Sequence, residues 1–309
     1  MIGPAHFTLL MFLLKARMKK SSFLLSISLL PALCIMAQTG SEIFLFDMKV
    51  NKGLVILSNP VNITKHKGYD NQPFFHPSKP LIYYSSFDDS SRSDIKYYNY
   101  RKNKTYLFTV TREREYSPTV TPDGNFISCI IQRDDGAQDL GEFPVKGGQP
   151  VILINDLKIG YHAWASTDKL LLFVLGDSNT NTLHYYHLSN KKDTIIATNI
   201  GRSLHKIPGQ NAMSFIQKVS AKEGMIQRFD LNSGTISTIT AALPGQDHLT
   251  WLQNNILLMS DGSKLFSYHL GMSGEWQAVI VEGDNTTLKR VTRLATNVSN
   301  TKLAVVVSE

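Results

Sequence analysis

Apolar and polar residues alternate along the chain in runs of strand length, and the stretch YSPTVTPDGNFISCII, which begins at Tyr116, shows the pattern most clearly. One apolar run ends near Val120, the turn TPDG follows, and a second apolar run begins. Pro122 fixes φ and the Asp-Gly pair after it supplies a tight reversal, so the stretch predicts a β-hairpin. Residues 38–309 show no helical spacing of apolar positions, which indicates an all-β chain.

The hairpin layout occurs six times. Other copies are QPFFHPSKPLIYYSS, HAWASTDKLLLFVLG and LHKIPGQNAMSFIQK, with weaker ones in LTWLQNNILLMSD and RLATNVSNTKLAVVV. Aligned turns are spaced by 45, 44, 42, 45 and 46 residues and place these residues in equivalent positions: Phe75, Val120, Trp164, Lys206, Trp251 and Asn297. Two further runs lie between copies, for example KLFSYHL and EWQAVIV, which gives four strands per unit. A β-sandwich would have irregular spacing, so the regular period favours a β-propeller.

The sixth unit is split between the two ends of the chain. The hairpin RLATNVSNTKLAVVV supplies two strands, and EIFLFDMK and LVILSNPVNIT near the start read as the third and fourth. Sharing a blade between the termini closes the ring and removes free strand edges. The sequence therefore predicts a six-bladed β-propeller with four antiparallel strands per blade and a last blade shared between N- and C-terminal strands.

The repeats resemble those of the TolB-type, WD-like β-propeller family, in which an SPDG turn joins the innermost strand of a blade to the second. SPTVTPDGNFI is the best match, and the turns of the other copies are degraded. The resemblance implies the same propeller over residues 38–309. TolB itself also carries a smaller α/β domain ahead of its propeller, for which this chain has no room. Similar propellers accompany serine peptidases, but no G-x-S-x-G motif occurs here.

The first 37 residues resemble a secretory leader. Lys19 and Lys20 precede an apolar run that ends in small residues, and Met18 is the expected true start. Cleavage after Ala37 is expected, with lipidation at Cys34 as the alternative. The apolar run is short for a membrane-spanning helix, so we expect a periplasmic or secreted protein without a transmembrane anchor.

Charge and cysteine content narrow the function classes. Removing the four basic residues of the leader from the 32 in the chain leaves 28 against 25 acidic ones, a net charge of +3. That charge is too small for a nucleic-acid partner. Cys129 is the one cysteine after the leader, so no intrachain disulfide is expected. We expect residues 38–309 to form one domain and a monomer.

No catalytic or cofactor signature stands out. The sequence has no H-E-x-x-H, no paired cysteines after the leader, no calcium loop and no phosphate-binding glycine loop. We therefore expect no enzymatic activity and no cofactor. The alternative is a metal-dependent hydrolase or lactonase of the six-bladed type, with its site on the central channel.

The starts of the innermost strands carry the candidate binding residues. These positions are polar or aromatic while the strands behind them are apolar, and loops on a rigid scaffold are where folds vary to recognise partners. The expected partner is a protein or peptide of the cell envelope, or alternatively a glycan. The candidates are Asp70, Tyr116, Tyr161, His162, Arg202, Asp247, His248 and Arg293.

Several conspicuous side chains have structural explanations. Trp164 and Trp251 occupy equivalent positions and are expected to pack between blades. His162, His205 and His248 could gather near the axis as zinc ligands, but strand alternation can also point them to different surfaces. Neither Tyr161 nor Arg202 is expected in the core.

Overall fold

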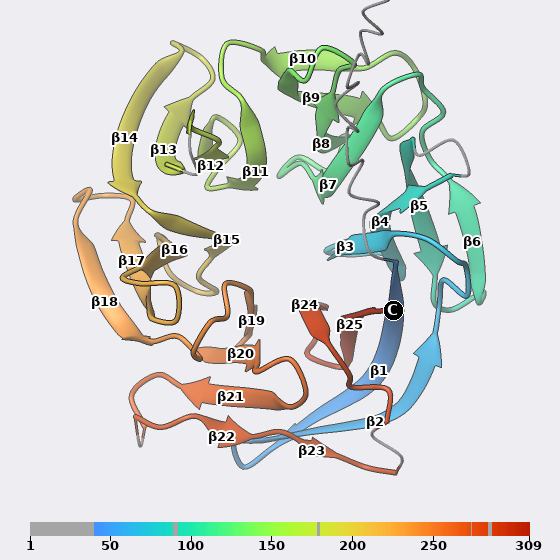
Figure 1. Ribbon diagram of the computed structural model, residues 1–309, viewed down its shortest axis with the longest axis vertical. Coiled ribbons are helices and arrows are strands. Elements are labelled where there is room, and N and C mark those ends of the chain that lie inside the picture. Colours follow the sequence, from blue (N-terminus) through green and yellow to red (C-terminus); the bar gives the residue numbers. More distant parts are fainter. Residues whose placement is uncertain (1–39, 89–91, 178–179, 273, 284–285) are drawn as a thin grey trace, which may run out of the picture. The chain divides into compact units, whose positions relative to one another are not determined.

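The computed structural model describes residues 40–88, 92–177, 180–272, 274–283 and 286–309. The leader, its cleavage after Ala37 and the alternative lipidation at Cys34 lie outside these ranges and stay predictions. The described residues form six β-sheets arranged in a ring, with no α-helix among them (Figure 1). Within these ranges no helix is long and apolar enough to cross a membrane.

Five blades follow one another along the chain, each with its innermost strand first (Figure 1). Blade 1 has β3 (Asp70–Phe75), β4 (Leu81–Phe87), β5 (Ser93–Asn99) and β6 (Lys104–Leu107). Blade 2 has β7 (Arg114–Val120), β8 (Phe126–Gln132), β9 (Gln138–Pro144) and β10 (Val151–Ile154). Blade 3 has β11 (Ile159–Trp164), β12 (Lys169–Val174), β13 (Thr182–His187) and β14 (Lys192–Thr198).

The next two blades repeat this order. Blade 4 has β15 (Ile200–Lys206), β16 (Ala212–Lys218), β17 (Gly224–Asp230) and β18 (Ile236–Ala241). Blade 5 has β19 (Leu249–Leu252), β20 (Ile256–Ser260), β21 (Leu265–His269) and β22 (Gln277–Ala278). The run EWQAVIV was expected to be one outer strand, and this is wrong. It divides, because β23 (Ile280–Val281) leaves blade 5 and pairs in parallel with β2 of the next blade.

The sixth blade confirms the predicted closure. Its strands are β24 (Val291–Thr296), β25 (Lys302–Ser308), β1 (Ser41–Asn51) and β2 (Leu54–Asn62). β1 and β25 pair antiparallel without a register shift, from Ser41 opposite Ser308 to Asp47 opposite Lys302. The Lys302 ammonium also forms an ion pair with the Asp47 carboxylate. We call this β1–β25 ladder the seam.

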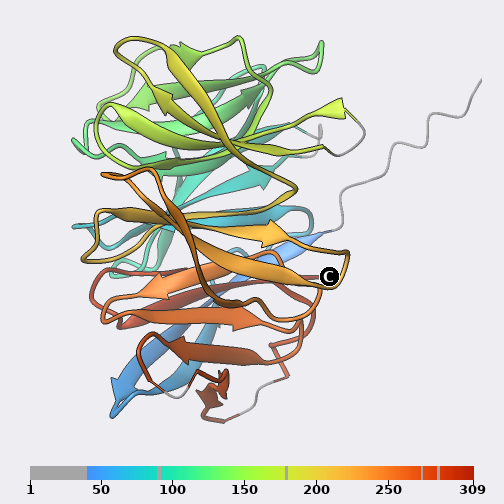
Figure 2. The same cartoon turned by 90° about the vertical axis from the view of Figure 1, so that its left-hand side faces the viewer.

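Apolar side chains pack between neighbouring blades rather than in one central core. Six clusters of buried residues each combine strands of two adjacent blades. Trp164 and Trp251 confirm their structural role, because each indole Nε1 donates to a serine hydroxyl of the preceding blade, Ser128 at 2.9 Å and Ser214 at 2.8 Å. Figure 2 shows the sheets edge-on, with many strands running along the short axis of the ring.

The innermost strands meet around the axis. Each of them contacts the innermost strands of both neighbouring blades. In five of the six blades, the pairing of this strand with the second one is interrupted by a register shift; β19 with β20 is the regular pair in the described chain. Such bulges turn side chains away from the regular alternation. The wall of the channel is therefore built from interrupted strands.

Candidate functional site

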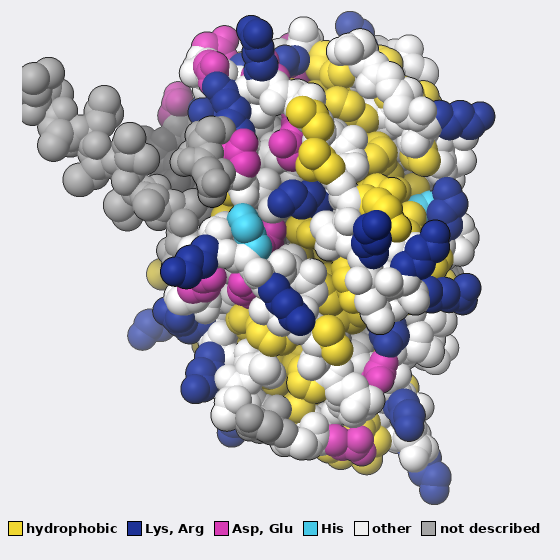
Figure 3. Space-filling view, turned by 90° about the vertical axis from the view of Figure 1, so that its right-hand side faces the viewer, with side chains coloured by type: hydrophobic (Ala, Val, Ile, Leu, Met, Phe, Trp, Pro, Cys, Tyr) yellow, Lys and Arg dark blue, Asp and Glu magenta, His cyan; other side chains and the backbone are white. Residues whose placement is uncertain are grey.

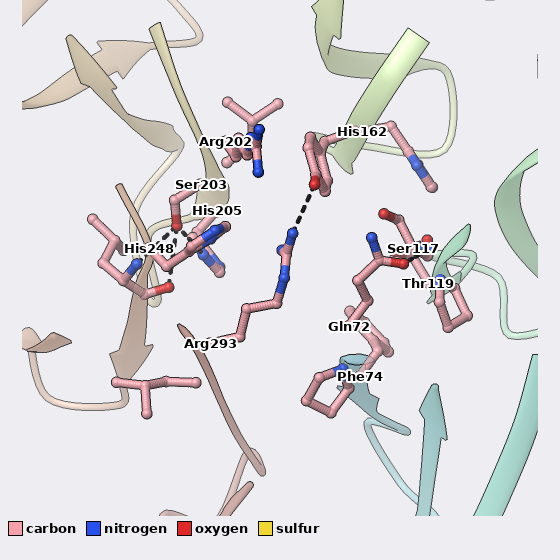
Figure 4. A pocket seen from close by; sticks show the side chains of 16 residues that line it. Gln72, Phe74, Ser117, Thr119, His162, Arg202, Ser203, His205, His248 and Arg293 are labelled. Carbon is pink, nitrogen blue, oxygen red and sulfur yellow. Dashed lines mark hydrogen bonds between the residues drawn. The ribbon is translucent and has the colours of Figure 1, made fainter. Parts of the chain in front are cut away.

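Two cavities follow the channel axis. The wider one has a volume of about 560 Å³ and lies among the starts of the innermost strands; we call it the mouth. The narrower one, about 110 Å³, is lined by later positions on the same strands and is drawn in Figure 4. Five residues line both and form the layer between them: Gln72, Tyr161, Arg202, His248 and Arg293.

Gln72 and Ser117 occupy the bulges of β3 and β7. Both have left-handed backbone conformations, with φ of 59° and 53°, which are uncommon for residues other than glycine. The Gln72 Oε1 accepts hydrogen bonds from the Ser117 N–H at 2.7 Å and from the Ser85 hydroxyl at 3.0 Å. The bond from the Ser117 N–H ties blade 1 to blade 2 at the channel wall. Strained backbone of this kind concentrates at functional sites.

Arg293 reaches across the channel. It starts from β24 of blade 6, and its Nη2 donates to the Tyr161 hydroxyl of blade 3 at 2.7 Å (Figure 4). Its guanidinium carbon also lies 4.9 Å from the centroid of the Tyr161 ring, which adds a cation–π contact. Blades 3 and 6 stand on opposite sides of the ring (Figure 1), so this pair separates the mouth from the narrower cavity.

Tyr161 also has a packing role. Its ring contacts Phe173 edge-on at 5.6 Å between centroids, and it packs against the buried cluster between blades 3 and 4. The expectation that Tyr161 stands clear of the core is wrong. Its ring buries apolar surface while its hydroxyl faces the channel, as is common for tyrosine.

The channel carries positive charge without a matching acid. Among the described residues that line the two cavities, none is aspartate or glutamate, whereas Arg202 and Arg293 line both. Arg202 is exposed, and within the described ranges its guanidinium has no hydrogen bond or ion pair. An arginine presents five N–H donors in a planar fork that fits carboxylate and phosphate groups.

Three histidines line the narrower cavity. His162 Nε2 lies 2.8 Å from the Ser128 hydroxyl, and His205 Nε2 lies 2.9 Å from the Ser203 hydroxyl. Burial lowers the pKa of His162 to about 3 and that of His205 to about 4. Burial, and then the charges of Arg293 and Arg202, hold the pKa of His248 well below its usual value. All three imidazoles are therefore neutral near pH 7.

Of the two arrangements left open by the sequence, the structure shows all three histidines lining one cavity, with His162 across it from His205 and His248. Figure 4 places His205 and His248 beside Ser203, across the cavity from Gln72 and Ser117. However, the described residues contain no group of three or more His, Cys, Asp or Glu side chains arranged to hold a metal ion.

Six of the eight candidate residues line a channel cavity, and two do not. Tyr116, Tyr161, Arg202, His248 and Arg293 line the mouth, and His162 lines the narrower cavity. Asp70 is 1% exposed and its carboxylate lies 3.2 Å from His66 Nδ1. The Asp247 carboxylate pairs with the Lys218 ammonium at 2.9 Å and lies 3.5 Å from Nε2 of His248. Both acids thus contact other side chains and do not themselves line the two cavities.

Sequence reasoning missed several lining residues. Gln72 and Ser117 belong to the dipeptides Gln-Pro and Ser-Pro inside strand-like runs, and proline in a strand is a signal for a bulge. Gln132, Gln138 and Asn181 of the mouth were missed as well; Gln132 and Gln138 come from the second and third strands of blade 2. Their amides become part of the channel only when the strands are placed in three dimensions.

Comparison with known proteins establishes the fold. No protein family profile and no curated protein sequence matches the chain. A putative TolB from Agrobacterium tumefaciens superposes with a TM-score of 0.64 at 11% identity, covering 88% of this chain and 99% of that one. TolB from Acinetobacter baumannii gives 0.55 at 10%, covering 86% and 63%. The chain has a TolB-like six-bladed propeller fold.

Other propellers of this shape differ in what they bind. An oligogalacturonate lyase in complex with manganese superposes with a TM-score of 0.57 at 11% identity, covering 89% of this chain and 99% of that one. A structure of a nidogen/laminin complex gives 0.60 at 10%, covering 82% and 97%. At these identities the similarity shows the fold alone, and the function has to be argued from the channel.

Proposed function

We propose that this chain is a non-catalytic binding propeller that takes a protein or peptide partner at the mouth of its channel. The observation that carries the proposal is the composition of the mouth: Tyr69, Tyr116 and Tyr161 lie beside an unpaired Arg202 in a cavity of about 560 Å³. Tyrosine and arginine are enriched among the residues that dominate binding energy at protein interfaces.

The amides of the mouth support the same proposal. Gln132, Gln138 and Asn181 each present both a donor and an acceptor, which matches the alternating N–H and C=O groups of a peptide backbone. The Asn71 amide is already used, because its oxygen accepts from the Gln72 N–H and its nitrogen donates to the Ser41 hydroxyl. The nidogen/laminin complex is an example of a protein of this fold in association with another protein. Export to the periplasm or beyond, expected from the leader, belongs to this proposal.

A metal-dependent hydrolase with a site on the channel is the second candidate. Three histidines line the narrower cavity, and the lyase of similar fold is in complex with manganese. In this chain the Nε2 atoms of His162 and His205 already contact serine hydroxyls, which does not favour metal ligation. A rise in melting temperature on addition of manganese or calcium, lost in a His248→Ala variant, would favour this candidate over the first.

Selection from a random heptapeptide display library tests the binding proposal. The full chain serves as bait, and selected peptides are measured against Tyr116→Ala and against a matched control, Tyr106→Ala. Tyr116 lines the mouth, whereas Tyr106 stacks on Tyr97 in the outer strands of blade 1. We expect binding to weaken about tenfold for Tyr116→Ala and to stay unchanged for Tyr106→Ala. Equal binding to the wild type and Tyr116→Ala would place the partner elsewhere.

A further inference from the structure

We infer that the mouth binds a peptide carboxylate between Arg202 and Arg293, with a neighbouring apolar side chain of the same peptide lying against Val219. This inference rests on the proposed function and names the chemistry that the mouth selects. The carboxylate belongs to an aspartate, a glutamate or the C-terminus of the partner.

Charge balance is the first argument. Two guanidinium groups line the same cavity, and no aspartate or glutamate in the described lining neutralises them. The neutral histidines beside them add hydrogen-bonding groups without adding charge. Since arginine and carboxylate form charge-assisted and often bidentate hydrogen bonds, an acidic group is the ligand that this cavity compensates best.

The fixed orientation of Arg293 is the second argument. Its Nη2 bond to the Tyr161 hydroxyl and the position of its guanidinium over the Tyr161 ring hold it across the channel before any ligand arrives. One N–H is used by Tyr161, and no other described residue accepts from the guanidinium, so its other donors are left for a ligand. A preorganised donor loses less side-chain freedom on binding than a mobile one.

A side groove points to a peptide rather than a compact anion. A further cavity of about 440 Å³ shares Phe173, Asn181 and Arg202 with the mouth and continues over blade 4 to Val219 and Ala221. Val219 is 64% exposed, so its apolar surface is accessible at the end of the groove. A free phosphate would fill the arginine end alone, whereas an extended chain reaches both ends.

One outer side of the ring, the side drawn in Figure 3, mixes charges of both signs. Its Lys and Arg side chains are spread among acidic, apolar and neutral ones. Dispersed surface charges contribute little to specific binding because solvent and salt screen them. The channel instead gathers two arginines within one cavity.

Two pools of acetylated, amidated heptapeptides test the inference. The pools carry Glu or Gln at the fourth position and random residues elsewhere except Asp and Glu, and retention on the immobilised full chain is measured by mass spectrometry. We expect the Glu pool to be retained at least about tenfold more than the Gln pool, with apolar residues enriched after the Glu. This ratio is expected to fall near one for Arg202→Gln and to persist for Arg101→Gln, an exposed arginine on the turn after β5.

The outcomes separate the inference from the proposed function. Equal retention of both pools would overturn the carboxylate inference and leave peptide binding standing. If neither pool were retained, both the carboxylate inference and the proposed peptide binding would be overturned. This would hold even if trigalacturonate or inorganic phosphate bound to the chain instead. A preference for Glu that persists in Arg202→Gln would show that the Glu carboxylate binds away from the mouth. It would overturn the assignment of the carboxylate to Arg202 and Arg293.

Discussion

The seam and the channel wall are built from the same kind of strand, but they use it differently. Along the seam, β1 and β25 stay in register over seven residue pairs, and Leu303, Val305 and Val306 are fully buried. Along the channel wall, the innermost strands of five blades lose register near their starts, and two non-glycine residues there have left-handed backbone. Regular pairing serves ring closure, and interrupted pairing aims side chains into the cavity.

This difference between the seam and the channel wall indicates where residues can be substituted without unfolding the protein. Ring closure depends on strands whose apolar side chains are buried on both faces of the sheet. A single polar substitution in these strands therefore lowers the stability of the fold. The channel wall is closed behind by the inter-blade clusters, so a lining residue that stands outside these clusters, such as Arg202, is free to serve recognition. Stability and binding should therefore respond to different substitutions.

The largest expected effect is at the seam. Val305→Asp should lower the free energy of unfolding by more than about 4 kcal/mol, because it buries a carboxyl group without a partner. Val305 is 0% exposed, whereas Val298, the matched control, is 54% exposed and Val298→Asp should change stability by less than about 0.5 kcal/mol. Urea unfolding checks both. Similar midpoints for the two variants would show that the seam does not hold the ring closed.

Acid should act on the channel wall. His162 has a pKa of about 3 in the folded chain, below its ordinary value, so the folded state keeps it neutral. As pH falls below about 6.5 the unfolded chain takes up the proton first, and stability should drop by about 1.4 kcal/mol for each pH unit from this residue. Urea unfolding between pH 7 and 4 should show a shallower decline for His162→Gln. Parallel curves would mean that His162 is not buried as described.

Glu115 lies buried on β7, where its carboxylate accepts hydrogen bonds from the Thr109 and Thr111 hydroxyls, and its effect on stability should depend on pH in the opposite direction. Burial raises its pKa to about 7, so the folded state prefers the protonated acid. The stability it contributes is present below about pH 4.5 and is lost as pH rises toward 7, because the unfolded chain ionises first. Glu115→Gln should therefore gain stability relative to the wild type between pH 5 and 8, by up to about 3 kcal/mol. If the difference in unfolding free energy between Glu115→Gln and the wild type stayed constant from pH 5 to 8, this prediction would be contradicted.

The smallest effect separates binding from stability. Arg202→Ala should weaken capture of an acidic peptide by at least about 1.4 kcal/mol and leave the melting temperature nearly unchanged, since the side chain is exposed. Tyr161→Ala should lower both, because Tyr161 contacts Phe173 as well as Arg293. Melting curves and calorimetric titration check the pair. A large loss of stability in Arg202→Ala would assign that residue to the fold.

Much of the architecture was predictable because the turn recurs at a nearly constant period. Phe75, Val120 and Trp164 do end the innermost strands, and the terminal half-units do share a blade. The split of EWQAVIV into β22 and β23 was not predictable, because it depends on β2 being available as a parallel partner. Such long-range pairing leaves no local pattern in the sequence.

The site was predictable in part for a similar reason. Strand starts identified Arg202 and Arg293 as channel residues, since every blade delivers its innermost strand to the axis. The same reasoning placed Asp70 in the mouth, but its side chain turns to His66 and is buried. Gln72 was missed because only the bulge and its left-handed backbone aim it into the channel. Side-chain direction after a bulge depends on the backbone dihedrals of the bulged residues, which the spacing of apolar positions does not provide.

The most direct test is a crystal structure of the full chain with a glutamate-containing heptapeptide retained from the Glu pool. The account predicts the Glu carboxylate within hydrogen-bond distance of the Arg202 and Arg293 guanidinium groups, with the peptide running over blade 4 toward Val219. A peptide bound to the outer strands or to the opposite face, with the mouth holding solvent alone, would contradict it.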